Sequence, residues 1–188
     1  MITNIYMLVC IGLFIYIRFI ESTKDFSYTA LKLGAMYPPK IHEKKEYWRI
    51  LTCHFIHIDP IHLFMNMYCI YYLGHFFESM MGTLQYGILV FSSMICSGLI
   101  TYFASYYSDH AMHTLTLGAS GVFYGYLGAV IGLALFRGGN FVSLLQNYLF
   151  MIVINLGFTL FAPGISKSGH LGGLLGGYLY IFVITQFF

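Results

Sequence analysis

The charged residues of this chain are so widely spaced that they restrict what it can fold into. Beyond Glu78, charges occur only at Asp109, Arg137 and Lys167, which leaves uncharged stretches of about 30 residues. Each stretch has room for one membrane-spanning helix of about 20 residues and a short connection. Only 9% of the 188 residues are charged and 59% are hydrophobic, whereas soluble domains have about 25% charged residues. The sequence therefore predicts an all-α integral membrane protein.

The apolar stretches predict six transmembrane helices in a single domain of residues 1–188. They are expected at about 2–20, 61–78, 84–106, 120–136, 143–161 and 169–187. The first stretch has neither a basic start nor a small-residue cleavage site, which favours an uncleaved helix over a signal peptide. The long first loop, 21–60, holds most of the charges and is expected to be an ordered, partly interfacial insertion.

Four polar residues are predicted to lie at similar depth in this bundle. Because the second, fourth and sixth helices run in the same direction, their starts lie at one membrane face. The polar residues near those starts are His62, Asn66, Ser120 and His170. Polar groups inside a membrane bundle are candidates for function.

Glycine stripes indicate which helices touch. Small residues repeated every fourth position allow membrane helices to approach closely. Such stripes occur in 120–136 (Gly121, Gly125, Gly128, Gly132) and in 169–187 (Gly169, Gly173, Gly177). If the two stripes face each other, Ser120 and His170 come within hydrogen-bonding reach. The periodicity also permits each stripe to pack on some other helix.

The residues near the helix starts fit the roles of a serine hydrolase. A histidine base can activate a serine hydroxyl, and no acidic residue lies near Ser120 or His170 in the sequence, so a Ser–His dyad is predicted. Tyr124, one turn after Ser120, is predicted to hold the imidazole ring. The backbone N–H of Ser120 and the side chains of His62 and Asn66 are predicted to stabilise an oxyanion.

Each of these features alone is more typical of helix packing or of an interhelical hydrogen bond, and only their agreement in depth and role favours catalysis. No metal or other cofactor is predicted. The run from His42 to Glu46 lacks the second histidine of a zinc-protease motif, and no carboxylate accompanies His62 or His170. The four scattered cysteines are interpreted as small buried hydrophobic residues, and no basic run indicates nucleic acid.

In these motifs the chain resembles the rhomboid family of intramembrane serine proteases, in its basic six-helix form. The matching residues are Trp48 and Arg49; His57, His62 and Asn66; Glu78 and Gly82; Gly118, Ala119, Ser120, Gly121 and Tyr124; and Gly169, His170, Gly173 and Gly177.

The resemblance implies a dyad of Ser120 and His170, with oxyanion contacts from His62 and Asn66 in a site that includes Gly118. It implies cleavage of peptide bonds in or near transmembrane segments of single-span membrane proteins. It also implies a water-filled cavity capped by the loop 161–168. The alternative is a non-catalytic rhomboid-like protein that binds membrane clients.

Other matched residues are given structural roles. Trp48 and Arg49 are expected to anchor the first loop, and His57 is expected to tie that loop to the second helix. Glu78 is expected to find a compensating partner among backbone N–H groups around Gly82. Gly173 and Gly177 are expected to serve helix packing.

The orientation in the membrane is predicted from conflicting signals. Positive charges are concentrated on the face that holds the candidate site, whereas the opposite face has only Arg137. These charges are Arg18, Lys24, Lys32, Lys40, Lys44, Lys45, Arg49 and Lys167. The positive-inside rule makes that face cytoplasmic, but the resemblance implies an extracytoplasmic site. We follow the resemblance, on the hypothesis that acidic residues of the first loop (Glu21, Asp25, Glu43, Glu46) pair with its lysines. The composition favours a bacterial plasma membrane.

Overall fold

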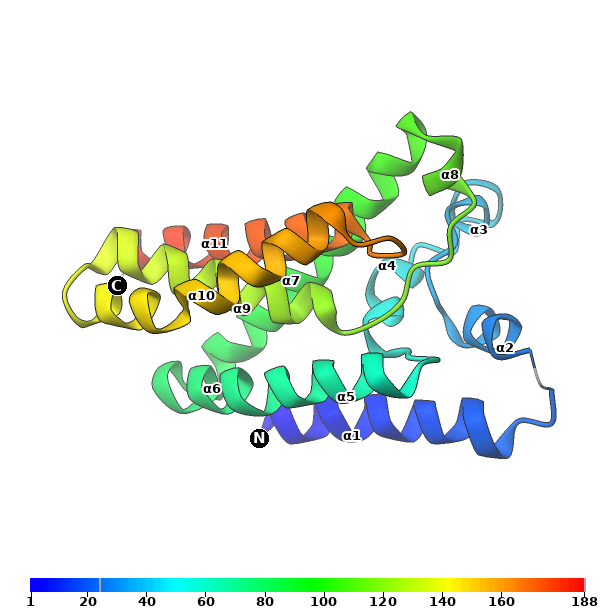
Figure 1. Ribbon diagram of the computed structural model, residues 1–188, viewed down its shortest axis with the longest axis horizontal. Helices are drawn as coiled ribbons and strands as arrows, with labels where there is room; N and C mark the ends of the chain where they lie inside the picture. Colours follow the sequence, from blue (N-terminus) through cyan, green and yellow to red (C-terminus); the bar gives the residue numbers. More distant parts are fainter. Residues whose placement is uncertain (24, 188) are drawn as a thin grey trace.

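The computed structural model describes residues 1–23 and 25–187 and is built from helices (Figure 1). In this part of the chain the only β pairing is an isolated antiparallel bridge between Met36 and Thr116. The helices are α1 (Ile2–Ile15), η1 (Tyr16–Ile20), α2 (Phe26–Leu33), α3 (Pro38–Lys44), α4 (Arg49–Thr52), η2 (Cys53–Phe55), α5 (Pro60–Cys69), η3 (Ile70–Gly74), α6 (His75–Met81), α7 (Thr83–Ala104), η4 (Ser105–Tyr107), α8 (Asp109–Met112), α9 (Ser120–Arg137), α10 (Asn140–Phe161) and α11 (Lys167–Phe187).

Five helices in the described residues are long and apolar enough to cross a membrane, which confirms the predicted class of helical membrane protein. They are Ile2–Ile20, Thr83–Tyr107, Ser120–Arg137, Asn140–Phe161 and Lys167–Phe187. The segment predicted at 61–78 is also helical, as the continuous run of α5, η3 and α6. It is not among the five, because His62, Asn66 and His75 lower its hydropathy. A sixth span therefore stays a prediction.

The helices α5, α9 and α11 begin at the same end of the bundle, on the right in Figure 1. The three start positions are Pro60, Ser120 and Lys167. This is the arrangement that the alternating direction of the helices predicts, and it brings polar residues from three distant parts of the sequence to one end of the molecule.

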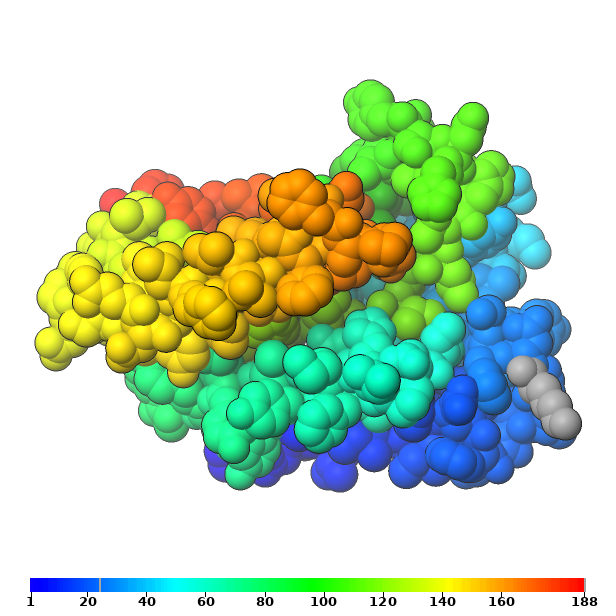
Figure 2. Space-filling model, viewed as in Figure 1, coloured from blue at the N-terminus to red at the C-terminus, as the bar shows by residue number. Residues whose placement is uncertain are grey.

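The central helix of the bundle is α9, which is mostly buried, whereas α10 lies on the outside with almost no buried residues (Figure 2). The glycine stripes of α9 and α11 face each other. A Cβ atom added at Gly173 would collide with the carbonyl oxygen of Gly121, and one at Gly177 with that of Gly125. The backbones of α9 and α11 are therefore in direct contact, which fixes the relative position of their first turns.

The first loop folds into the short helices α2, α3 and α4, which are held together by Arg49. The side chain of Arg49 is buried, and its Nη1 donates to the carbonyl oxygens of Leu31 and Ala35 at 2.7 and 2.8 Å. Its guanidinium also pairs with Glu46 and lies 4.5 Å from the ring centre of Trp48. These contacts make the loop an ordered unit.

The expected pairing of acidic residues with lysines in this loop is not found among residues 1–23 and 25–187, where the one ion pair joins Glu46 to Arg49. Asp25 instead caps α2 by accepting the backbone N–H of Tyr28 at 2.9 Å. This correction follows from geometry, because a carboxylate at a helix start is closer to free backbone N–H groups than to a flexible lysine. Lys24 lies outside the described residues.

Glu78 has a different partner from the one expected around Gly82. Its carboxylate accepts the backbone N–H of Ile2 at 2.7 Å and both the N–H and the hydroxyl of Thr3, at 3.1 and 2.7 Å. The carboxylate thus caps the start of α1, where the helix dipole favours negative charge. Backbone N–H groups are partners of Glu78, as predicted, but they belong to the start of α1 and not to the residues around Gly82.

Candidate active site

Ser120 and His170 lie next to each other at the starts of two touching helices. Ser120 is the first residue of α9, and His170 lies in the first turn of α11. The hydroxyl Oγ of Ser120 is 2.9 Å from Nε2 of His170. The contact between Gly121 and Gly173 brings them together, because each glycine is close in sequence to one member of the pair.

Tyr124 lies one helical turn after Ser120 and covers the imidazole of His170. The two rings are stacked, with centroids 4.1 Å apart and planes inclined by 18°. The phenol ring is almost fully buried, so it has little freedom to leave this position. The hydroxyl of Tyr124 donates to the backbone carbonyl of Asn155 in α10 at 2.6 Å.

The second ring nitrogen of His170 contacts Thr159, a residue that the sequence interpretation missed. Thr159 is fully buried in α10, and its Oγ1 is 2.8 Å from Nδ1 of His170. Thr159 and Asn155 are polar residues spaced i, i+4 in the apolar second half of α10. His62 and Asn66 have the same spacing, so a comparable signal was present in the sequence.

His62 approaches the site beside Gly118. A Cβ atom added at Gly118 would lie 2.5 Å from Cε1 and 2.9 Å from Nε2 of His62, and Gly118 has a φ of +117°. Both the space and the backbone conformation therefore require glycine here. The ring of His62 makes no hydrogen bond to the described residues, so its N–H remains free for a ligand. At the start of α5, Pro60 is the first residue and the side chain of Asp59 accepts the backbone N–H of His62.

The side-chain amide of Asn66 is already engaged. Its Nδ2 donates to the carbonyl oxygen of His62 at 3.1 Å and lies 3.3 Å from Nε2 of His57. One of these two bonds must be exchanged before Asn66 can donate to a reacting group. The structure therefore brings Asn66 to the site but does not leave its amide free.

His57 links the first loop to the peptide that precedes the serine. Its Nε2 accepts the backbone N–H of Ala119 at 3.1 Å and lies 3.3 Å from the amide nitrogen of Asn66. The contact with Asn66 agrees with the expected tie to the second helix, and the contact with Ala119 was not foreseen. Burial lowers the pKa of His57 to about 3, with a further lowering by the neighbouring His62, so the ring is neutral and Nε2 can act as an acceptor.

The histidines of the segment 54–62 have separate environments. His54 is buried, with Nε2 3.0 Å from the carbonyl oxygen of Met94, and burial lowers its pKa to about 4. Across the residues that the structure describes, no group of three or more His, Cys, Asp or Glu side chains could hold a metal ion. The segment therefore contributes contacts to the first loop, α7 and the serine peptide.

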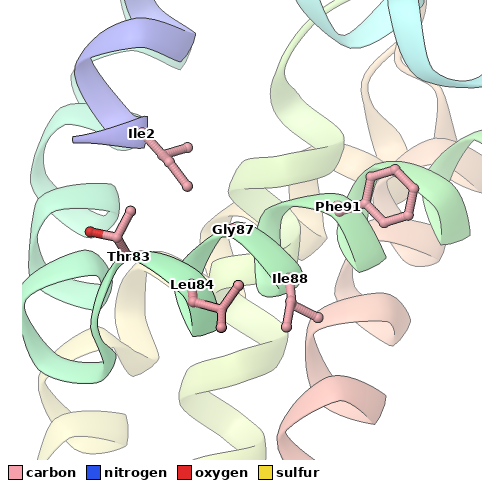
Figure 3. Close-up of a pocket in the computed structure, with 6 residues that line it drawn as sticks. All are labelled: Ile2, Thr83, Leu84, Gly87, Ile88 and Phe91. Atoms are coloured by element: carbon pink, nitrogen blue, oxygen red, sulfur yellow. The ribbon is translucent and has the colours of Figure 1, made fainter.

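A separate pocket lies between the start of α1 and α7. Its volume is about 490 Å³, and its lining is almost wholly apolar (Figure 3). The lining residues are Ile2, Thr83, Leu84, Gly87, Ile88 and Phe91. It includes none of the polar residues described above and no ionisable group, so it offers no acid, base or nucleophile.

The site thus combines a potential nucleophile, a base and hydrogen-bond donors. No hydrogen bond from the backbone N–H of Ser120 is found within the described residues, as expected for the first N–H of a helix. A serine hydroxyl beside an imidazole can attack a carbonyl carbon. The free N–H groups of Ser120 and His62 can donate hydrogen bonds to the oxyanion that such an attack creates. This chemistry needs no charged side chain inside the bilayer.

Apolar helices around a buried central helix define a multi-pass membrane protein, and the comparison with protein families shows which kind. The family model of the Rhomboid domain matches residues 44–187. The chain belongs to the rhomboid family.

Named relatives come from plants, bacteria and parasites. The chain is 30% identical to RHOMBOID-like protein 7 of Arabidopsis thaliana over 84% of this chain and 49% of the relative. It is 33% identical to Rhomboid protease GluP of Bacillus subtilis over 71% of this chain and 25% of that protein. It is 32% identical to Rhomboid-like protease 1 of Toxoplasma gondii over 77% of this chain and 49% of that protein. The chain thus spans at most about half the length of these three relatives.

Proposed function

We propose that the chain is an intramembrane serine endopeptidase that hydrolyses peptide bonds in or near the transmembrane segments of single-span membrane proteins. The observation that carries this proposal is the 2.9 Å contact between Ser120 Oγ and His170 Nε2 at the starts of two membrane helices. Membership of the rhomboid family and the protease names of the Bacillus and Toxoplasma relatives support it.

In the first step, Ser120 attacks the substrate while His170 acts as the base. The hydroxyl proton moves to Nε2, and Oγ forms a bond to the carbonyl carbon of the scissile peptide. The carbonyl oxygen becomes an oxyanion. The imidazolium then donates its proton to the leaving nitrogen, the C–N bond breaks, and an ester between the substrate and Ser120 remains.

The oxyanion is stabilised by donors at the start of α9. The backbone N–H of Ser120 has no internal partner and lies where the helix dipole favours negative charge. The ring N–H of His62 is also free. Asn66 contributes as a third donor after giving up its bond to the carbonyl oxygen of His62 or to His57.

The second step is hydrolysis of the ester. His170 takes a proton from a water molecule, whose oxygen attacks the ester carbon. The bond to Ser120 Oγ then breaks and the proton returns to Ser120. Tyr124 keeps the imidazole in one plane throughout, because its stacked ring prevents the imidazole from turning about its Cβ–Cγ bond.

The catalytic face is proposed to be extracytoplasmic, against the count of positive charges. Arg49 is buried and paired, so it does not act as a free charge at the membrane surface. Reporter fusions within Glu43–Glu46 and after Arg137 test this orientation. A cytoplasmic signal from the first loop would overturn it.

The proposed activity is tested by labelling and cleavage with Ser120→Ala. The wild-type protein in liposomes should react with a serine-directed phosphonate and cleave a model single-span substrate, and a strong chelator should not abolish cleavage. Ser120→Ala should lose the label, and its cleavage rate should fall by about 10⁴-fold or more. A folded wild-type protein that neither takes the label nor cleaves any substrate of a panel would support the client-binding alternative.

A further inference from the structure

The proposed mechanism requires one particular tautomer of His170. Nε2 must carry the lone pair that accepts the serine proton, so the ring hydrogen must be on Nδ1. In many serine hydrolases a buried carboxylate next to Nδ1 selects this tautomer. No hydrogen bond or ion pair joins His170 to a carboxylate in the described part of this chain, so another group must perform the selection.

Thr159 is the group that contacts Nδ1 of His170, at 2.8 Å from its Oγ1. It belongs to the short set of buried residues on α10, together with Ile152, whereas its neighbours Phe158 and Leu160 are exposed. A β-branched side chain in a helix has few accessible rotamers. Its hydroxyl is therefore held in place beside the imidazole.

The hydrogen bonds around Thr159 can be assigned by counting donors and acceptors. The hydroxyl has one hydrogen and two lone pairs. Its hydrogen is directed at the backbone carbonyl of Asn155, which only accepts, at 2.9 Å. Tyr124 donates its one hydrogen either to this carbonyl, at 2.6 Å, or to a lone pair of Thr159, at 2.5 Å. In both cases a lone pair of Thr159 remains for Nδ1 of His170. In this arrangement Nδ1 is the donor.

The opposite assignment removes the hydrogen bond from Ser120 to the base. If the hydroxyl of Thr159 donated to Nδ1, the hydrogen of His170 would be on Nε2 and would point at Ser120 Oγ. The hydroxyl hydrogen of Ser120 would then point away from His170, its only hydrogen-bond partner in the described chain, and Nε2 would have no lone pair to accept it. The first assignment places the hydrogens of Ser120, Tyr124, Thr159 and His170 in hydrogen bonds within the site, and it gives Nε2 the lone pair that a base needs.

We propose that Thr159 is a positioning residue that holds His170 in its Nδ1–H tautomer, as a neutral third member of the site beside Ser120 and His170. This inference rests on the proposed function only for its effect on rate. A neutral hydroxyl performs the selection without a buried carboxylate, whose charge is unfavourable inside a bilayer. The arrangement also makes α10 part of the site, although that helix otherwise lies on the outside of the bundle.

Substitutions at Thr159 test the proposal. Thr159→Val removes the hydroxyl at nearly constant shape, and Thr159→Ser restores it. We expect Thr159→Val to lower kcat by about 10- to 100-fold with little change in KM, as a loss of base orientation would. Thr159→Ser should recover most of the rate. Thr185→Val is the matched control, since Thr185 makes the same bond to a carbonyl one turn earlier, at Ile181, and lies outside the site.

The tautomer itself is measured by ¹⁵N NMR of histidine-labelled protein in micelles, with His170 assigned from a His170→Asn sample. Wild type should show a protonated Nδ1 and an unprotonated Nε2, and Thr159→Val should show a mixture. A wild-type His170 protonated on Nε2 would overturn the proposal even if no Thr159 variant folded. A wild-type rate and tautomer in Thr159→Val would do the same. Failure of the protease proposal would appear separately, as a wild-type protein that neither cleaves nor takes the phosphonate.

Discussion

Acidification is expected to destabilise the protein through two buried histidines, His54 and His57. Burial lowers the pKa of His54 to about 4 and that of His57 to about 3, whereas an unfolded histidine has a pKa of about 6.5. Because the folded values are the lower ones, the unfolded chain binds these protons more readily. The stability that the two residues contribute is therefore complete above about pH 6.5 and is lost as the pH falls towards about 4 and 3.

The magnitude follows from the difference in proton binding at a chosen pH. At about pH 5 the unfolded rings are almost fully protonated, while both folded rings remain largely neutral. The interval of about 1.5 pH units below the unfolded pKa corresponds to about 2 kcal/mol for each histidine, or about 4 kcal/mol for two independent sites. For a domain of this length, such a loss lowers Tm by roughly 8–16 °C.

Thermal unfolding in detergent at about pH 7.5 and about pH 5 measures this effect. His54→Gln and His57→Gln keep a donor towards Met94 and an acceptor for the N–H of Ala119 but do not titrate, so each should make the pH-dependent decrease in Tm smaller by roughly 4–8 °C. His110→Gln, at an exposed residue of α8, is the control and should keep the full decrease. A wild-type Tm that is the same at both pH values would refute the reasoning, and so would equal slopes in all three variants.

Three further substitutions test the packing of α9 on α11, the cap on α1 and the oxyanion site. Gly177→Ala should destabilise the protein by about 1–3 kcal/mol, because its Cβ would collide with the carbonyl oxygen of Gly125; Gly157→Ala, where no atom lies within 4 Å, is the control, and equal Tm values would contradict the contact. Glu78→Gln should lower the free energy of unfolding by about 1–3 kcal/mol, because it weakens the cap on α1. An unchanged Tm would show that the cap contributes nothing. His62→Ala should lower kcat/KM by about 10²–10³-fold with little change in Tm, and a wild-type rate would remove His62 from the oxyanion site.

Much of the fold could be predicted because the bilayer imposes strong rules on composition. Uncharged stretches between Glu78, Asp109, Arg137 and Lys167 have the length of a membrane helix, and the direction of successive helices alternates. The glycine repeats predicted close helix contacts but left their partners open, and the structure shows that α9 and α11 contact each other. The second predicted span was harder to establish, because polar residues such as His62 and Asn66, which we propose to serve the site, reduce the apolar signal on which the prediction depends.

The contacts that the sequence did not predict depend on the rotation and relative depth of helices, which periodicity does not specify. Glu78 was expected to find its partner nearby, whereas the start of α1 lies beside it. Thr159 was missed although Asn155 and Thr159 are spaced i, i+4, because the sequence does not show that this face of α10 contacts His170. The bond between His57 and the N–H of Ala119 joins a loop to a helix start, and no pattern in either segment indicates it.

The central claim is that Ser120 and His170 form a catalytic pair, and the most direct test combines phosphonate labelling with product masses. Purified wild type, Ser120→Ala and His170→Ala are reconstituted with a single-span substrate, after thermal unfolding has shown that all three are folded. The account predicts label and cleavage in or near the transmembrane segment for wild type alone. Cleavage of the same bond by Ser120→Ala, or a folded wild type that takes no label, would contradict it.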